Sequence, residues 1–215
     1  FNKYDIMNDL MSLGIHRLWK QRFIEWMNPK KGDSLIDMAA GTGDIANAFL
    51  RRIKNQGHVS CVDPNKLMVE QGKKKLKYLK NIQWYISSAE NLPFKDNVFD
   101  IYSVSFGVRN FSDTQKALRE AHRVLKSGGR FICLEFSKVE NEILNKVYKT
   151  YSKTIPFIGK YIVGDSEPYD YLIKTIDEFY DQESFKKIIL DNGFNNVEYR
   201  NLSGGIVAIH SAWKI

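Results

Sequence analysis

Cysteine is scarce in this chain, whose 215 residues include only two. Cys61 and Cys133 each lie inside a short apolar run typical of a strand, where a thiol behaves as a small core side chain. Neither belongs to a C-x-x-C pair or has the spacing of metal ligands. The sequence therefore argues against a disulfide scaffold and a cysteine-based metal site, and it predicts a reducing compartment.

Long apolar runs are also absent. No segment approaches the roughly 18 consecutive apolar residues that a membrane-spanning helix needs, and no secretory signal peptide, repeat or low-complexity tract is visible. The chain begins at Phe1 rather than at methionine, so we expect a short leader to precede it. These features predict a single domain over residues 1–215, located in the cytoplasm.

The balance of charge is basic, with 32 Lys and Arg against 25 Asp and Glu and a net charge of +7. Such a balance fits a polyanionic partner, either nucleic acid or an anionic membrane surface, or else lysines spread over a solvated surface. Runs such as residues 73–75 (Lys-Lys-Lys) favour the second interpretation for the chain as a whole.

Hydrophobic periodicity predicts a sheet covered by helices. Residues 5–28 carry an apolar stripe at helical spacing that ends at Asn28 and Pro29. Short apolar strands are predicted at 34–39, 59–62, 82–86, 99–104 and 131–136, and helices at 45–54, 67–79 and 113–125. Near-continuous apolar strands that alternate with amphipathic helices are typical of a parallel sheet with both faces covered.

The C-terminal part departs from this alternation. Residues 196–202 and 206–213 flank a Ser-Gly-Gly turn and predict a β-hairpin. Residues 138–192 are rich in aromatic side chains and lysine, and they predict a helical insertion. The predicted fold is therefore α/β, with a mostly parallel sheet and an antiparallel C-terminal hairpin.

A glycine-rich turn follows the first predicted strand. Asp37 ends this strand, and Gly41, Thr42 and Gly43 lead into the next helix. Glycines permit a tight turn and a close approach to a ligand, and the helix N-terminus offers free N–H groups. Asp63 lies about 20 residues further on, at the end of the second strand, where it can accept hydrogen bonds from a ribose diol.

Two ligands fit this turn. Gly41, Gly43 and Ala46 match the G-x-G-x-x-G/A pattern of dinucleotide sites. Asp37 and Asp44, however, surround the turn with negative charge, which would repel a pyrophosphate and suits the ammonium and sulfonium of S-adenosyl-L-methionine. The charge therefore favours S-adenosyl-L-methionine over NAD as the cofactor.

Three further segments resemble landmarks of the class I S-adenosylmethionine-dependent methyltransferases. They are Ser88-Ala89-Glu90 after the third strand, Phe99-Asp100, and the Leu-Lys-Ser-Gly-Gly-Arg stretch at residues 125–130. This class has a Rossmann-like, mostly parallel sheet closed by an antiparallel hairpin, and the resemblance implies that fold here. It also implies that the segment at Ser88 holds the adenine ring.

More specific strings resemble the ubiquinone/menaquinone biosynthesis C-methyltransferases of the UbiE type. They lie at residues 4–9, 14–20, 105–110, 134–137, 151–152, 156–159 and 201–210, and so run through nearly the whole chain. Ala40 and Ser88 depart from the family's common Gly and Asn without removing a needed functional group. The resemblance implies methyl transfer to a ring carbon of a polyprenylated benzoquinol or naphthoquinol. It implies cofactor contacts at Thr42, Asp63, Ser88, Ala89 and Ser105.

A ring carbon is a poor nucleophile until the adjacent hydroxyl loses its proton, so a base is expected, acting directly or through water. Arg109 and Asn110 follow the fourth strand, where this class places substrate-facing groups, and Arg109 would orient the phenolate or polarise a water. The alternative for Arg109 is a surface residue that pairs with a helix carboxylate. Glu135 is either a site carboxylate or a buried structural one. Candidates for the base are His16, Asp5 and His210.

Rival functions remain open at the level of sequence. A nucleic-acid methyltransferase is disfavoured, because residues 105–110 lack an Asn/Asp-Pro-Pro-aromatic run, neither cysteine is placed as a nucleophile, and no RNA-binding module is appended. A small-molecule O- or N-methyltransferase is the second enzyme interpretation. A non-catalytic scaffold conflicts with the intact Gly41, Gly43 and Asp63. A polyprenylated quinol is thus the expected partner, and a homo-oligomer or a quinone-synthesis complex stays open.

Residues 138–160 are the candidate for peripheral membrane association. They carry five lysines against Glu140 and Glu142, and their apolar residues recur at helical spacing. Basic residues beside an apolar stripe suit a helix that lies in a lipid interface, here at the inner face of the membrane. The alternative is a stripe that caps the pocket and packs on the sheet.

Overall fold

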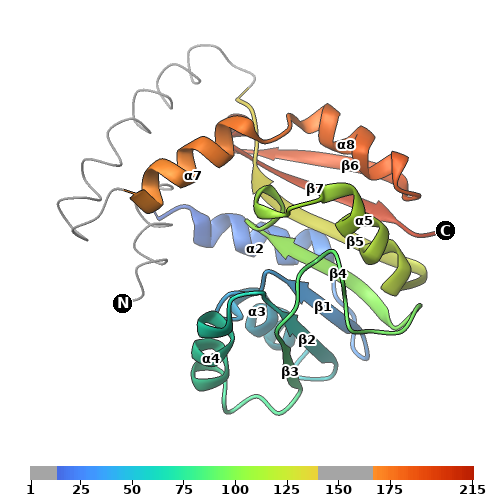
Figure 1. Cartoon of the computed structure of the whole chain (residues 1–215). Coiled ribbons are helices and arrows are strands. Elements are labelled where there is room, and N and C mark those ends of the chain that lie inside the picture. Colours follow the sequence, from blue (N-terminus) through green and yellow to red (C-terminus); the bar gives the residue numbers. More distant parts are fainter. Residues whose placement is uncertain (1–13, 140–166) are drawn as a thin grey trace.

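The computed structural model describes residues 14–139 and 167–215, and in these ranges one sheet carries helices on both faces (Figure 1). Its seven strands lie in the order β3-β2-β1-β4-β5-β7-β6. The strands are β1 (Ser34–Met38), β2 (His58–Val62), β3 (Ile82–Tyr85), β4 (Phe99–Ser105), β5 (Leu125–Phe136), β6 (Asn195–Leu202) and β7 (Val207–Trp213). The helices are α2 (His16–Met27), α3 (Asp44–Arg52), α4 (Lys66–Lys75), α5 (Thr114–Val124), α7 (Glu167–Glu178) and α8 (Gln182–Asp191), with short 3-10 turns η1 (Val108–Asn110) and η2 (Ser203–Gly205).

Strands β1 to β5 are parallel to one another, and β7 and β6 complete the sheet as antiparallel strands. The predicted α/β fold with a parallel sheet and a C-terminal hairpin is therefore confirmed. The sheet reverses its winding between β1 and β4, since β2 and β3 lie on one side of β1 and β4 and β5 on the other. Ligands of such sheets bind at this switch point, beyond the carboxyl ends of the strands.

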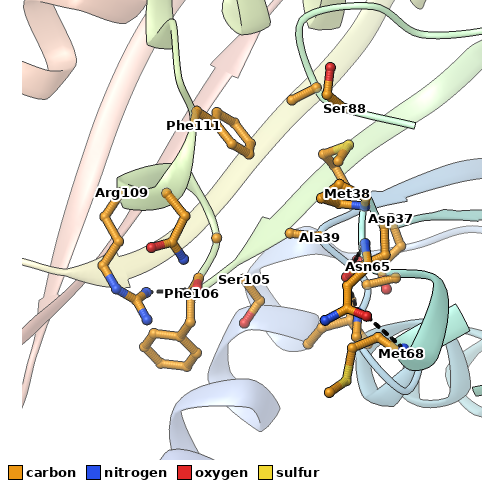
Figure 2. Close-up of a pocket in the computed structure, with 18 of the residues that line it drawn as sticks. Asp37, Met38, Ala39, Asn65, Met68, Ser88, Ser105, Phe106, Arg109 and Phe111 are labelled. Carbon is orange, nitrogen blue, oxygen red and sulfur yellow. Dashed lines mark hydrogen bonds between the residues drawn. The ribbon is translucent and has the colours of Figure 1, made fainter. Parts of the chain in front are cut away.

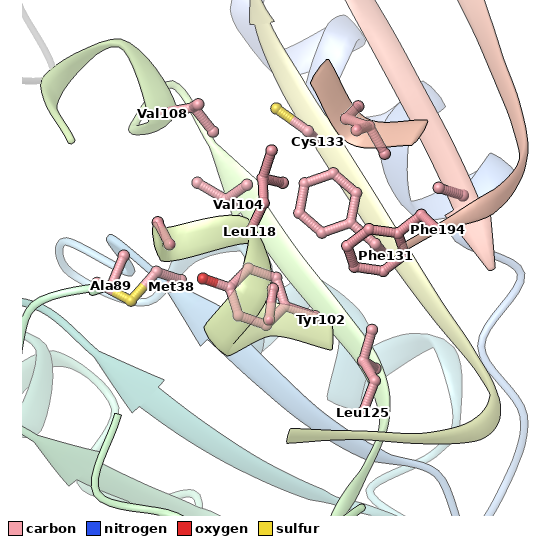
Figure 3. Close-up of a cluster of buried hydrophobic side chains, with 14 of the residues drawn as sticks. Met38, Ala89, Tyr102, Val104, Val108, Leu118, Leu125, Phe131, Cys133 and Phe194 are labelled. Carbon is pink, nitrogen blue, oxygen red and sulfur yellow. The ribbon is translucent and has the colours of Figure 1, made fainter. Parts of the chain in front are cut away.

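The two faces of the sheet have separate apolar cores. One core packs α2, α3 and α7 on the sheet and includes Phe23 and Phe49. The other packs α5 and α8 and includes Tyr102 and Phe131, whose rings stack at 5.6 Å (Figure 3). Ile132, directly after Phe131, belongs to the first core. Successive residues of one strand therefore point to opposite faces, and both faces are apolar.

Two predicted boundaries within the described ranges differ from the structure by more than three residues. The helix predicted at 67–79 ends at Lys75, because Leu76 leaves the helical conformation and buries its side chain. The strand predicted at 131–136 begins at Leu125, although residues 125–130 are polar and rich in glycine. Pairing explains the longer strand: Leu125 lies opposite Phe99 of β4, and the N–H of Gly128 donates to the carbonyl of Lys214 at 2.7 Å.

Cys61 in β2 and Cys133 in β5 are buried and free, as their apolar neighbours predicted. Burial raises the pKa of both thiols. In the described ranges no helix combines the length and apolarity that spanning a bilayer requires, and no group of acidic, histidine and cysteine side chains is placed to hold a metal ion.

The region predicted to be a helical insertion contains α7 and α8 in its described part. Helix α8 packs on β6 and β7, and its Phe185 and Ile189 are fully buried. Residues 140–166 lie outside the described ranges, and the apolar stripe with Lys146, Lys149 and Lys153 falls there. Asp5, one of the candidate bases, lies outside them too.

Candidate active site

A cavity of about 440 Å³ opens beyond the carboxyl ends of β1, β2 and β4, at the switch point of the sheet. In Figure 2, Asp37, Met38 and Asn65 form one wall, and Phe106, Arg109 and Phe111 form the opposite wall. Most of the predicted site residues line this cavity, namely Asp37, Gly41, Thr42, Asp63, Ser88, Ala89, Ser105, Arg109 and Asn110.

Gly43 is not among the described residues that line the cavity, and its role as a cofactor contact stays a prediction. It takes a left-handed conformation with φ of 84°, and a Cβ there would lie 2.7 Å from Leu76 Cδ1 and 3.0 Å from Trp84 Cη2. Gly43 is therefore required by the turn and by close packing. Gly41 differs, because a Cβ at that position would meet nothing within 4 Å. Because Gly41 has no side chain, the space beside it in the cavity stays open.

The turns after β1 and β4 touch each other at the cavity floor. Ala39 and Phe106 both have positive φ, at 53° and 56°, which is uncommon for residues with a side chain. A Cβ at Gly107 would lie 2.5 Å from the Cβ of Ala39. Strained backbone that close packing holds in place is frequent at functional sites. Here the close packing fixes the end of β4 against the glycine turn.

Asp63 holds the glycine turn as well as facing the cavity. Its Oδ2 accepts the N–H of Gly41 at 2.9 Å, and its Oδ1 accepts the N–H of Asn65 at 2.8 Å. Burial raises the pKa of Asp63, and the two amide hydrogen bonds oppose that shift. A carboxylate oxygen has two lone pairs, so both oxygens can accept a further hydrogen bond from a ligand in the cavity.

Asp37 presents an unsatisfied carboxylate oxygen at the cavity. Ser103 donates to its Oδ1 at 2.8 Å, while Oδ2 is buried and accepts no hydrogen bond from a described residue. Burial raises the pKa of Asp37 to about 7. Ser105 Oγ and Arg109 Nε, on the same cavity, are likewise buried without a partner among the described residues. Buried polar atoms are normally satisfied, so these three indicate contacts that a bound ligand completes.

Asp44 does not add free negative charge to the turn, contrary to the electrostatic interpretation of the sequence. Its Oδ2 accepts from Lys20 Nζ at 2.8 Å and its Oδ1 from Lys75 Nζ at 2.7 Å. Burial alone would raise the pKa of Asp44, but the two lysines outweigh it and hold the pKa well below its usual range. Asp44 is therefore shared by two lysines, whereas no ion pair of the described residues involves Asp37 or Asp63, which also line the cavity.

Arg109 is buried and paired with a strand residue, so its interpretation as a surface arginine beside a helix carboxylate is wrong. Its side chain is only 8% exposed, and that of Glu135 is 2% exposed. Arg109 Nη1 donates to Glu135 Oε1 at 2.7 Å and to the carbonyl of Phe106 at 2.6 Å, and the guanidinium lies 5.5 Å from the centre of the Phe136 ring. Glu135 is thus a buried structural carboxylate that fixes Arg109 at the cavity wall.

The exposed Asn110 also lines the cavity, beside a residue that sequence reasoning missed. The hydroxyl of Tyr171 in α7 donates to Asn110 Oδ1 at 3.2 Å. Tyr171 and Lys20 both line the cavity although they are far from its central strands in sequence. Lys20 could have been suspected as a site residue from the sequence, because it lies in the family-like segment at residues 14–20. Tyr171 lies in no such segment.

The two candidate histidines lie away from the cavity lining. His210 is buried in β7, where its Nε2 lies 3.0 Å from the carbonyl of Gln182 and its ring packs on Phe185 at 4.9 Å. Burial lowers the pKa of His210 to about 4. This corrects its proposed role as a base. His16 is buried at the start of α2 and is not among the described residues that line the cavity, and its role as the base stays a prediction.

The fold, with its glycine turn after β1, is shared with solved S-adenosylmethionine-dependent methyltransferases. The structure is similar to the crystal structure of a SAM-dependent methyltransferase from Aquifex aeolicus. The TM-score is 0.72, and the sequences are 18% identical over 100% of both chains. It is also similar to a SAM-dependent methyltransferase from Thermotoga maritima, described as a possible histamine N-methyltransferase, with a TM-score of 0.70 and 19% identity over 100% of this chain and 95% of that one. At these identities the likeness shows the fold.

The chain belongs to the ubiE/COQ5 methyltransferase family, whose model matches residues 1–214. A Rickettsia bellii protein named ubiquinone/menaquinone biosynthesis C-methyltransferase UbiE is 50% identical over 221 residues, which cover 100% of this chain and 89% of that protein. The Bos taurus mitochondrial 2-methoxy-6-polyprenyl-1,4-benzoquinol methylase is 44% identical over 250 residues, which cover 99% of this chain and 76% of that protein.

Proposed function

We propose that this enzyme transfers a methyl group from S-adenosylmethionine to a ring carbon of a polyprenylated benzoquinol or naphthoquinol in ubiquinone or menaquinone biosynthesis. Family membership over the whole chain and the names of its relatives support this function. The observation that carries it is one cavity lined by the glycine turn, Asp63 and the buried Arg109, with Asp37 and Arg109 on opposite sides of it (Figure 2).

The residues on the β1 side of the cavity fit the methyl donor. Asp63, which accepts the N–H of Gly41, would also accept from the ribose hydroxyls, and the cavity-lining Ser88 and Ala89 would pack on the adenine ring. The free Oδ2 of Asp37 matches the ammonium of the amino-acid portion. S-adenosylmethionine supplies the methyl group on a sulfonium, and the protein's task is to align that group with the acceptor carbon.

The residues on the β4 side fit an aromatic alcohol. Arg109 Nε is a buried donor without a described acceptor, so it can hold the oxygen of a phenolate. Phe106 and Phe111 give that wall an apolar surface for a ring, and Asn110 and Tyr171 add polar groups at its rim. Stabilising the phenolate places electron density on the adjacent ring carbon, which is the atom that attacks the methyl group.

Cofactor binding is expected to depend on the ionisation of Asp37. A cationic ligand favours the carboxylate, so binding near pH 7 should release a proton, and affinity should rise about 10-fold between about pH 6 and pH 8. Besides burial, the pKa of Asp37 is lowered by Ser103, by the backbone N–H of Ala46 and by Lys20, and it is raised by Asp44. Calorimetric titration in buffers of different ionisation enthalpy measures the proton release. Asp37→Asn should bind more weakly with a flatter pH profile; an unchanged profile would remove Asp37 from the subsite.

The site of methylation tests the proposed function directly. The enzyme should be supplied with isotopically labelled S-adenosylmethionine and either a reduced prenylated benzoquinone or a reduced prenylated naphthoquinone. The product spectrum by nuclear magnetic resonance should show the label on a ring carbon for at least one substrate. A label on oxygen would favour the O-methyltransferase interpretation instead.

Peripheral membrane association, a cytoplasmic location and a single domain over residues 1–215 also stay proposals. The basic, apolar stripe at residues 138–160 supports membrane binding, because a polyprenyl quinol resides in the bilayer. Co-sedimentation with liposomes should then require anionic lipid, decrease with salt, and fall when Lys146, Lys149 and Lys153 are changed to Gln. Binding that ignores lipid charge and these substitutions, or no binding, would contradict it.

A further inference from the structure

We propose that Lys20 forms the subsite for the α-carboxylate of the methyl donor, opposite the Asp37 oxygen that receives its ammonium. This inference rests on the proposed placement of the cofactor in the cavity. It assigns a ligand contact to α2, a helix that precedes the first strand of the sheet.

The charges around Lys20 leave room for an additional anion. Lys20 lines the cavity, and its side chain is 19% exposed. Its ammonium donates to Asp44 Oδ2 at 2.8 Å, while Lys75 takes the other oxygen of the same carboxylate at 2.7 Å. An ammonium has three N–H donors, so Lys20 retains donors for a ligand. Two lysines that share one carboxylate also leave a net positive charge at this end of the cavity.

The other lining cation is committed elsewhere. Arg109 forms its ion pair with the buried Glu135 on the opposite wall. Lys20 is therefore the cavity-lining cation, within the described ranges, whose charge is not balanced by a carboxylate of its own.

The position of Lys20 relative to Asp37 matches an amino acid. Lys20 is close enough to Asp37 to act on its carboxylate electrostatically, and both line the same cavity beside the glycine turn. Asp37 Oδ2 is buried without a hydrogen-bond donor among the described residues, and the neighbouring helix offers a cation that shares its carboxylate partner, Asp44, with Lys75. A zwitterion carries the complementary pair of charges, and the amino-acid portion of S-adenosylmethionine is a zwitterion.

Paired ligands and paired variants test this subsite. Calorimetric titration of the full chain should compare S-adenosylmethionine with decarboxylated S-adenosylmethionine, which keeps the sulfonium, the ammonium and the nucleoside. The wild type should bind the complete donor about 10- to 100-fold more tightly, the value of one charge-assisted hydrogen bond. Lys20→Met should lose that preference by binding the complete donor more weakly, and its affinity for the decarboxylated donor should stay within about threefold.

Lys75→Met is the matched control, because Lys75 binds the same Asp44, and also Thr42 Oγ1 at 3.0 Å, but is not itself among the described residues that line the cavity. It should keep the preference for the complete donor, and so should Lys20→Arg, which retains a cation if Lys20→Met folds poorly. Equal loss for both ligands in Lys20→Met, or an equal effect of Lys75→Met, would reduce Lys20 to a support of Asp44 and overturn the inference. Equal affinity of the wild type for both ligands would also overturn the Lys20 subsite, but it would leave the proposed function intact. If the wild type bound neither ligand, the proposed function itself would be contradicted.

Discussion

Replacing Asp63 with alanine is expected to weaken S-adenosylmethionine binding by about two to four orders of magnitude. Two ribose hydroxyls would lose a charged acceptor, at about 1.5–3 kcal/mol for each hydrogen bond. The substitution also leaves the N–H groups of Gly41 and Asn65 without their acceptor, so the glycine turn loses its attachment to the end of β2. Isothermal titration calorimetry measures the affinity.

Asp63→Asn separates these two effects. An amide oxygen can still accept one of the backbone hydrogen bonds but carries no charge, so its affinity should lie between those of the wild type and Asp63→Ala. Thermal unfolding of both variants should show a loss of stability of about 1–3 kcal/mol, which is the cost of unpaired buried amides. Cofactor affinity of Asp63→Ala within about threefold of the wild type would show that the ribose lies elsewhere.

Replacing Arg109 with lysine is expected to lower kcat about 100-fold, with cofactor affinity within about threefold of the wild type. Lysine preserves a cation for Glu135, but it lacks the planar fork and the Nε donor of Arg109, which is buried without a partner among the described residues. Steady-state kinetics and calorimetry together distinguish an effect on turnover from an effect on binding.

Alanine at position 109 is a less informative change, because it leaves the Glu135 carboxylate buried without its partner. Breaking such a pair costs about 3–5 kcal/mol of stability, so Arg109→Ala should unfold at a lower temperature than Arg109→Lys. Parallel losses of cofactor binding and turnover in Arg109→Lys would make Arg109 a structural residue of the β4 turn.

The carboxyl ends of the strands could be predicted from the sequence. Apolar runs alternating with amphipathic helices place strand ends at one edge of a parallel sheet, so Asp37, Asp63, Ser88 and Ser105 had to converge once the fold was correct. Local sequence was sufficient because each of these residues lies at the carboxyl end of its own strand or just beyond it.

Contacts between distant segments could not be predicted in this way. The pairing of Asp44 with Lys75 depends on where α4 ends, and the burial of Arg109 depends on Glu135 of β5. His210 carried no local sign that it would be enclosed between α8 and β6. From the sequence, Asp44 was predicted to attract a cationic ligand. In the structure its carboxylate is paired with two lysines.

The dependence of turnover on the oxidation state of the acceptor tests the central claim most directly. A quinol has a hydroxyl whose deprotonation makes the ring carbon nucleophilic, whereas an oxidised quinone has electrophilic ring carbons and no proton to lose. Methyl transfer from labelled S-adenosylmethionine should therefore be measured with the same prenylated substrate, with dithionite and without it. The proposed function predicts transfer to the reduced ring and none above background to the oxidised ring. Equal rates on both would contradict attack by a phenolate-activated carbon.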